Sequence, residues 1–235
     1  MKEINTILVL GDSLSRGVLL DEKRKKYYFS DKCFFTFVKE KISPLIKNLA
    51  KFGATTLHCQ KNLEKNLEEY KPDLVLIEYG GNDCDFDWSE IAKTPLEEHL
   101  PHVTLKDFED HLTKIISKVK DYGAIPILMT LPPLVADSYF NWFTNGDKQM
   151  GDNVQEWLKG TWVIYYWQER YSSAIRHFAD KNNLNLIDIR HAFLEHPDFR
   201  KLMCSDGIHP NEAGHRLIAD EIIKYVSANR KELIV

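Results

Sequence analysis

A serine, an aspartate and a histidine stand in two short motifs near opposite ends of the chain. Ser13 lies in LVLGDSLSRG (residues 8–17), where an apolar run passes directly into turn residues, and Asp206 and His209 lie in SDGIHPNEAGH (205–215). A serine hydroxyl becomes an effective nucleophile when an imidazole takes its proton, and a carboxylate can hold that imidazole in place. These residue types therefore fit acyl transfer, with Ser13 as nucleophile, His209 as general base and Asp206 as its partner.

Two further motifs offer hydrogen-bond donors for the negative oxygen that forms when serine attacks an ester. FGATT (52–56) contains Gly53, whose N–H no side chain obstructs, and YGGNDCD (79–85) contains Asn82 with its amide group. The N–H of Ser13, at a helix start, is the third donor that we predict for an oxyanion hole. Each motif alone is typical of an ordinary turn. The four together favour the catalytic interpretation.

The elements that must position these motifs are short apolar runs separated by amphipathic segments. Segment 106–120 and the C-terminal segment 213–226 repeat apolar residues at helical spacing. Strands alternating with helices indicate a parallel sheet covered on both faces, with its ligand site beyond the carboxyl ends of the strands. The runs that we expect to be strands are INTILVL (4–10), PLIKNLA (44–50), DLVLIEYG (73–80), IPILMTL (125–131) and LNLIDI (184–189).

In chain order, GDSLS, Gly53, GGND and DGIHP resemble the four sequence blocks of the SGNH (GDSL) hydrolases. The resemblance implies an α/β fold: a flavodoxin-like, three-layer α/β/α sandwich with a five-stranded, mainly parallel sheet. It also implies hydrolysis of esters or thioesters without a metal or cofactor, with the catalytic and oxyanion roles given above. The segment before Gly53, LAKF, lacks the extra glycine that many members have.

Residues beside the motifs are the expected substrate contacts. An aromatic-rich insertion at about 132–160 follows the fourth strand, and we expect 137–145 to lie at the active rim and most of 161–178 to be a helix packed on the sheet. We expect Asp12 also to fix its loop by accepting hydrogen bonds from nearby amides. The predicted substrate contacts are Asp12, Leu14, Asp83, Ile208, Tyr139 and Trp142.

Composition narrows the remaining function classes. The net charge of −4 offers no basic surface for nucleic acid, and KRKK (23–26) is too short to change this; a solvated loop is expected there. No apolar run is long enough to span a bilayer. The four cysteines are scattered without zinc-site spacing, which favours reduced thiols in the cytoplasm; Cys84 and Cys204, beside the site motifs, are interpreted as packing residues.

We therefore predict a cytoplasmic serine esterase made of one domain over residues 1–235. Its substrate is predicted to be a small-molecule carboxylic ester, with a short or medium acyl group, a lysophospholipid or a thioester as candidates. The alternative within the same family is a carbohydrate O-acetylesterase. A non-catalytic module that binds a small ligand on the same fold is the competing class. No feature of the sequence predicts an oligomeric state.

Overall fold

A five-stranded parallel sheet lies at the centre of the molecule, which is a computed structural model describing residues 3–235. Its strand order, β4-β1-β5-β6-β7, places the first strand between the second and third strands of the sheet, as in flavodoxin-like sheets. The five strands predicted from the sequence are confirmed: β1 (Thr6–Gly11), β4 (Leu45–Asn48), β5 (Leu74–Glu78), β6 (Ile125–Met129) and β7 (Asn185–Ile187).

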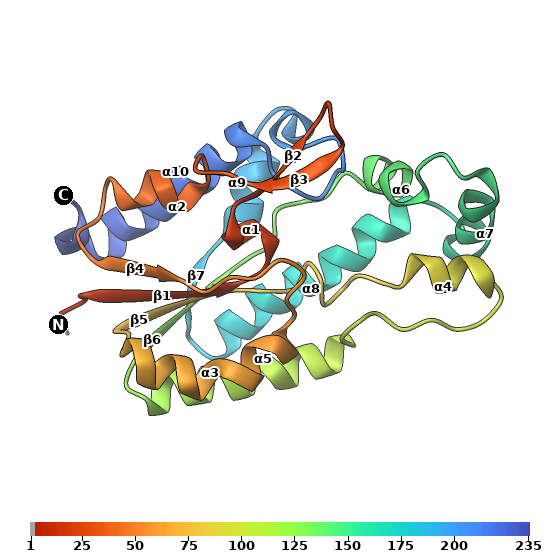
Figure 1. Cartoon of the computed structure of the whole chain (residues 1–235). Coiled ribbons are helices and arrows are strands. Elements are labelled where there is room, and N and C mark those ends of the chain that lie inside the picture. The colour runs from red at the N-terminus through yellow and green to blue at the C-terminus, as the bar shows by residue number, and fades with distance from the viewer. Residues whose placement is uncertain (1–2) are drawn as a thin grey trace.

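Helices cover both faces of the sheet, which confirms the three-layer sandwich (Figure 1). One layer holds α2 (Phe34–Lys39), α9 (Ile189–Glu195) and α10 (Glu212–Asn229). The other holds α3 (Thr56–Tyr70), α5 (Leu105–Asp121) and α8 (Trp162–Lys181). The two amphipathic segments expected to be helices lie inside α5 and α10. Three short helical segments lie between the larger elements or after them: α1 (Ser13–Arg16), η1 (Phe199–Leu202) and η2 (Lys231–Leu233).

Strand β1 shows why the central runs are apolar throughout. Ile7 and Val9 point into one apolar cluster, while Leu8 and Leu10 point into the other. Successive side chains of a strand face opposite sides, so a sheet covered by helices on both sides buries all of them. No helix among the described residues is long and apolar enough to cross a membrane.

An extension of helices projects beyond the carboxyl ends of the strands (Figure 1). The predicted insertion forms α6 (Ala136–Thr144) and α7 (Lys148–Leu158), which pack with α4 (Trp88–Lys93) and the start of α8 around a third apolar cluster. The Trp88 and Phe143 rings stack at 4.5 Å between centroids. Helix α8 packs on the sheet as expected for most of 161–178, and Tyr171 is fully buried. Trp162 and Tyr166 are the aromatic exceptions, with 65% and 50% of their surface exposed.

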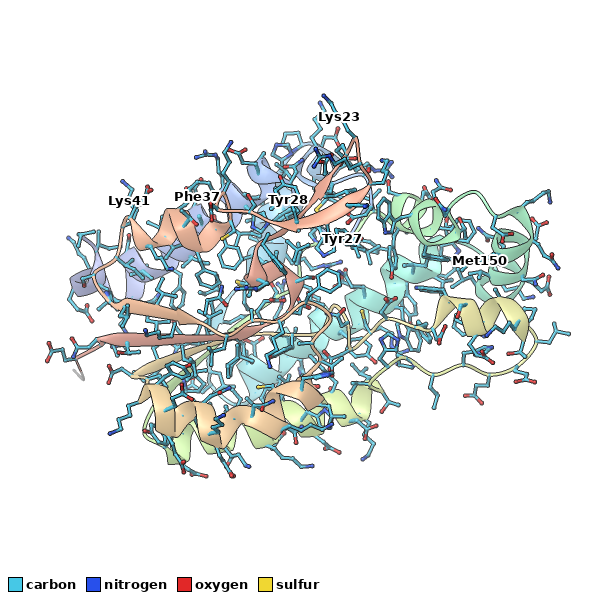
Figure 2. The ribbon with its side chains drawn as sticks, viewed as in Figure 1. Lys23, Tyr27, Tyr28, Phe37, Lys41 and Met150 are labelled. Carbon is cyan, nitrogen blue, oxygen red and sulfur yellow. The ribbon has the colours of Figure 1, made fainter. Side chains whose placement is uncertain are left out.

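A hairpin of β2 (Val18–Asp21) and β3 (Lys26–Phe29) follows α1 and is absent from the sequence prediction. The KRKK segment forms its turn and the first residue of β3, so the loop expected there covers only residues 23–25. Figure 2 shows Lys23 at the tip of the hairpin and Tyr27 on the side facing the body of the molecule. This orientation brings the hairpin into the site described next.

Candidate active site

The four motifs meet at the carboxyl edge of the sheet. Ser13 follows β1, Gly53 lies in the loop after β4, and Asn82 lies in the turn after β5. Asp206 and His209 do not follow β7 directly; their loop lies between η1 and α10. The spatial condition for the predicted chemistry is therefore met, because residues from both ends of the chain converge here.

Ser13, His209 and Asp206 form one continuous chain of hydrogen-bond contacts. His209 Nε2 lies 2.9 Å from Ser13 Oγ, and His209 Nδ1 lies 2.7 Å from Asp206 Oδ2. Asp206 is fully buried and His209 is nearly so. The ring thus has one nitrogen directed at a hydroxyl and the other at a carboxylate, the arrangement that a general base requires.

Backbone groups hold the Asp206 carboxylate beneath the ring. Its Oδ1 accepts the N–H groups of Ile208 and His209, both at 3.1 Å. Burial favours the neutral acid, but the hydrogen bond and charge of His209 and these two N–H groups lower the pKa of Asp206 below its ordinary value. Gly207 makes the turn possible, since its φ is +76° and a Cβ there would lie 2.5 Å from the Val135 carbonyl oxygen.

Asp12 fixes the turn that presents Ser13. Its Oδ1 accepts the Leu14 N–H at 2.9 Å, which caps the short helix α1, and its Oδ2 accepts the Asn82 amide at 3.0 Å. The predicted loop-fixing role of Asp12 is confirmed by these two bonds. The helix cap leaves the Ser13 N–H at the helix start, where it donates to no other group among residues 3–235.

The donors predicted for the oxyanion lie on three different loops. Asn82 Nδ2 donates both of its hydrogens within the protein, to Asp12 Oδ2 and, at 3.2 Å, to the Ala54 carbonyl. Gly53 adopts φ +70°, and a Cβ built there would meet nothing within 4 Å, so its surroundings are open. His102 Nδ1 lies 3.0 Å from the Asn82 carbonyl and steadies that turn from behind.

A second buried carboxyl lies directly under the nucleophile turn. Glu78, at the end of β5, is fully buried, and its Oε2 accepts the Ser15 hydroxyl at 2.8 Å. Burial, and next the charge of Asp12, raise the pKa of Glu78 well above its usual range, while burial raises that of Asp12 to about 6. Glu78 Oε2 also accepts the Asp12 and Ser15 N–H groups, at 3.4 and 3.3 Å, whereas its Oε1 accepts no donor from the described part of the chain. The pKa of Glu78 is raised more strongly than that of Asp12, so Glu78 is the partner that holds the proton and Asp12 is the charged one.

Three rings, those of Tyr27, Phe52 and Trp142, form a cluster, called the aromatic shelf below, that reaches His209 through two of its members. The Tyr27 ring meets the imidazole edge-on, with 4.8 Å between centroids, and the Phe52 ring is nearly parallel to the imidazole at 6.3 Å. Tyr27 also contacts Phe52 at 5.5 Å and Trp142 at 5.7 Å. The three rings come from the hairpin, the loop before Gly53 and α6, so they gather only in the fold.

Hydrogen bonds connect the hairpin to the loop that carries Asp206. Glu22 accepts the Ser205 N–H at 2.9 Å and the Ser205 hydroxyl, and Lys25 Nζ lies 3.0 Å from the same hydroxyl. Ser205 precedes Asp206 in the chain. The hairpin therefore braces the acid loop as well as supplying Tyr27.

The cavity beside Ser13, called the active-site cavity below, receives four of the six predicted substrate contacts. It encloses about 90 Å³ and is lined by Asp12, Leu14, Tyr139 and Ile208 among others. Asp83 and Trp142 do not line it. Asp83 is fully buried and accepts the N–H and hydroxyl of Thr56, which anchors α3, so its position does not suit a substrate contact. Trp142 lies instead on the aromatic shelf.

Sequence reasoning missed the polar residues that support the cavity wall. Arg190 is buried, pairs with Glu169 at 2.6 Å, and donates to the Leu131 and Pro132 carbonyls and to Gln168, all three of which line the cavity. The signal in the sequence that could have pointed to this role is a single arginine within the largely apolar segment IDIRHAF (187–193). Each cysteine is a buried free thiol, and burial raises the pKa of Cys204 to about 11, which fits the packing interpretation.

Comparisons with known proteins agree with this geometry. The model of the GDSL-like lipase/acylhydrolase family matches residues 9–217, which include all four motifs. An arylesterase of Vibrio mimicus is 25% identical over 228 residues, covering 94% of this chain and 89% of that protein. A GDSL esterase/lipase of Arabidopsis thaliana, CPRD49, is 24% identical over 160 residues, 66% of this chain and 55% of the plant protein. The chain spans about half the length of the plant relatives that it matches.

Solved structures share the whole fold. A lipase/acylhydrolase from Enterococcus faecalis superposes with a TM-score of 0.68 at 20% identity over 96% of each chain. An acetylxylan esterase from Geobacillus stearothermophilus superposes with a TM-score of 0.65 at 18% identity, also over 96% of each chain. Since the family model covers most of the sequence together with its four motifs, the chain belongs to the GDSL-like lipase/acylhydrolase family, a family of ester hydrolases.

Proposed function

We propose that the protein is a serine esterase that hydrolyses carboxylic esters through an acyl-enzyme. The observation that carries this proposal is the unbroken contact chain from Ser13 Oγ through His209 to Asp206, at 2.9 and 2.7 Å. Family membership supports it independently. A binding module would have no need of a hydroxyl, an imidazole and a buried carboxylate in this order.

In the first half-reaction, Ser13 Oγ attacks the ester carbonyl carbon while His209 Nε2 takes the hydroxyl proton. Asp206 stabilises the imidazolium, which then gives the proton to the departing alcohol as the C–O bond breaks. In the second half-reaction, His209 takes a proton from water, the hydroxide attacks the acyl-serine, and the proton returns to Ser13 as the carboxylic acid leaves.

The negative oxygen of each tetrahedral intermediate is stabilised by Ser13 N–H, Gly53 N–H and Asn82 Nδ2. Asn82 exchanges its long bond with the neutral Ala54 carbonyl for a bond with the oxyanion. Hydrogen bonds to an ionised acceptor are about twice as strong as those between neutral groups. The gain therefore arises mainly in the transition state, where it accelerates the reaction.

Two substrate classes follow. The first is a simple ester or thioester with a short or medium acyl group, lysophospholipids included. The second is an O-acetyl group on a carbohydrate, and the aromatic shelf favours it, because flat rings beside His209 suit a sugar as the departing alcohol. The acetylxylan esterase with the same fold is named for such a substrate. Cytoplasmic location and a single domain stay predictions.

A fluorophosphonate probe tests the proposal. It should label the wild-type protein at Ser13, and Ser13→Ala should abolish labelling. The Ser15→Ala variant is the matched control, because Ser15 lies two residues after Ser13 in α1 but its hydroxyl is buried and bonded to Glu78. A folded protein that leaves the probe unreacted would be a binding module on this fold.

A further inference from the structure

The extension supplies an apolar part of the wall of the active-site cavity. Residues from α4, α6, α8 and the loop before α6 line it together with the Ser13 turn, the loop after β5 and the His209 loop, and the residues from the extension are largely apolar. The wall residues used in the argument are Phe86, Trp88, Leu134, Tyr139, Ile164 and Trp167. A group that enters from Ser13 is therefore surrounded by hydrocarbon and by ring faces.

His209 separates this cavity from the aromatic shelf. None of the shelf residues lines the cavity, yet Tyr27 and Phe52 both contact the imidazole. Phe52 is 52% exposed, so the shelf side is open to solvent. In a two-step hydrolysis the alcohol leaves first and water then enters, while the acyl group stays in place. The solvent-exposed aromatic shelf suits the departing alcohol, and the apolar active-site cavity suits the acyl group that stays on Ser13.

We propose that the active-site cavity is the acyl pocket of this enzyme and that it admits acyl chains of about two to four carbons, with the alcohol seated on the aromatic shelf. This inference rests on the proposed function, since it requires an acyl group on Ser13. It narrows the acyl class that the sequence left open and excludes long-chain lipids as good substrates.

The size limit follows from the volume. An engineered apolar cavity of about 150 Å³ accommodates benzene, a ring of six carbons, and this one encloses about three fifths of that volume. Three or four carbons therefore fill it. The carbonyl carbon lies at Ser13, so a butyryl chain reaches the end of the pocket.

Hydrogen bonds among Trp88, Tyr139 and Asp85 stiffen one side of the wall against expansion. Trp88 Nε1 donates to Asp85 at 2.9 Å, and the Tyr139 hydroxyl donates to the other oxygen of Asp85 at 2.7 Å. The stack of Trp88 on Phe143 supports the same wall from behind. Close-packed interiors of this kind yield little to an oversized group.

A chain-length series tests the inference. We expect kcat/KM for p-nitrophenyl esters to be highest from acetyl to butyryl and to fall at least about tenfold by octanoyl. Leu134→Ala removes three carbons from the wall and should move the optimum longer by about two carbons. Ile164 lies on α8, so Ile164→Ala enlarges the same pocket from a different element and tests the same shift if Leu134→Ala does not fold. Leu158 is buried in the same apolar cluster but does not line the pocket, so Leu158→Ala should keep the wild-type dependence of kcat/KM on chain length.

The outcomes separate the two proposals. If the folded protein cleaves no ester of the series and leaves a fluorophosphonate unreacted, the proposed function is wrong. If it cleaves acetyl and dodecanoyl esters equally well, or if both enlarged variants keep the wild-type optimum, the enzyme stands and the acyl-pocket assignment is wrong. A shift in Leu158→Ala equal to that in Leu134→Ala would also refute it, because loosening of the extension would then be the cause.

Discussion

Replacing Glu78 with glutamine should make the protein less sensitive to rising pH. Glu78 is fully buried, and its raised pKa means that the folded state keeps a proton which the unfolded chain releases above about 4.5, the ordinary value. Where the folded state binds more protons, the free energy of unfolding falls as pH rises. Glutamine mimics the neutral acid: its oxygen can accept from Ser15, and its NH₂ can donate toward Asp12.

The magnitude follows from one retained proton. Each pH unit between the unfolded and folded pKa values changes the free energy of unfolding by about 1.4 kcal/mol. Wild type should therefore lose about 1.4 kcal/mol of stability relative to Glu78→Gln for each pH unit above about 5 over which the folded state keeps the proton. Buried Asp83 and half-buried Asp85 also have raised pKa values. They change the pH dependence of both proteins alike, so the difference between the two proteins isolates Glu78 and its partner Asp12.

Urea denaturation at a series of pH values measures this difference directly. Glu68→Gln, on the exposed side of α3, is the matched control for the loss of one carboxylate from the chain. The stability of Glu78→Gln minus that of wild type should grow steadily with pH, while the Glu68→Gln difference should stay level. A Glu78→Gln difference that is constant from about pH 5 to pH 8 would mean that Glu78 is ionised in the fold, and the assignment of the proton would be wrong.

Four further variants test the chemistry. Ser13→Ala and His209→Ala should each lower kcat by several orders of magnitude while the protein stays folded, because members of a triad act as a unit. Near-normal turnover in either variant would remove that residue from the mechanism. Asn82→Ala should lower kcat by about 10²–10³ with a smaller change in KM, as loss of one oxyanion donor does, whereas a pure KM effect would place Asn82 in ground-state binding. Tyr27→Ala should raise KM several-fold for p-nitrophenyl butyrate and less for methyl butyrate, measured side by side, and equal changes would exclude the aromatic shelf as the alcohol site.

The strands, and the convergence of the candidate catalytic residues, were predictable because their signals are local. A continuous apolar run indicates a strand covered on both faces, and the parallel arrangement then sends every carboxyl end to one edge. Once Ser13 and His209 are placed at that edge, their chemistry requires them to meet. The parallel sheet and its helical layers follow from these runs and their spacing, whereas the flavodoxin-like arrangement came from the family resemblance and the hairpin was not predicted.

The errors concern residues whose roles depend on direction or on distant partners. Asp83 is adjacent to Asn82, yet successive side chains in a turn point to different sides, and Asp83 points to Thr56. Tyr27 contacts His209 from the β2–β3 hairpin. The charged residues of its turn interrupt the sequence between two short strands, so neither strand was recognised. Glu78 is one acid in an apolar strand, and its importance depends on Asp12, which lies far away in the sequence.

The contact between Ser13 and His209, 196 positions apart, ties the proposed activity to the folding of the whole span between them. During synthesis, residue 13 leaves the ribosome long before residue 209, so the serine has no imidazole beside it until that span has emerged. A contact of such long range forms late, since closing a large loop costs entropy before any bond is gained. Molecules that end before residue 209 should therefore be inert, and hydrolysis begins only when the sheet edge has assembled.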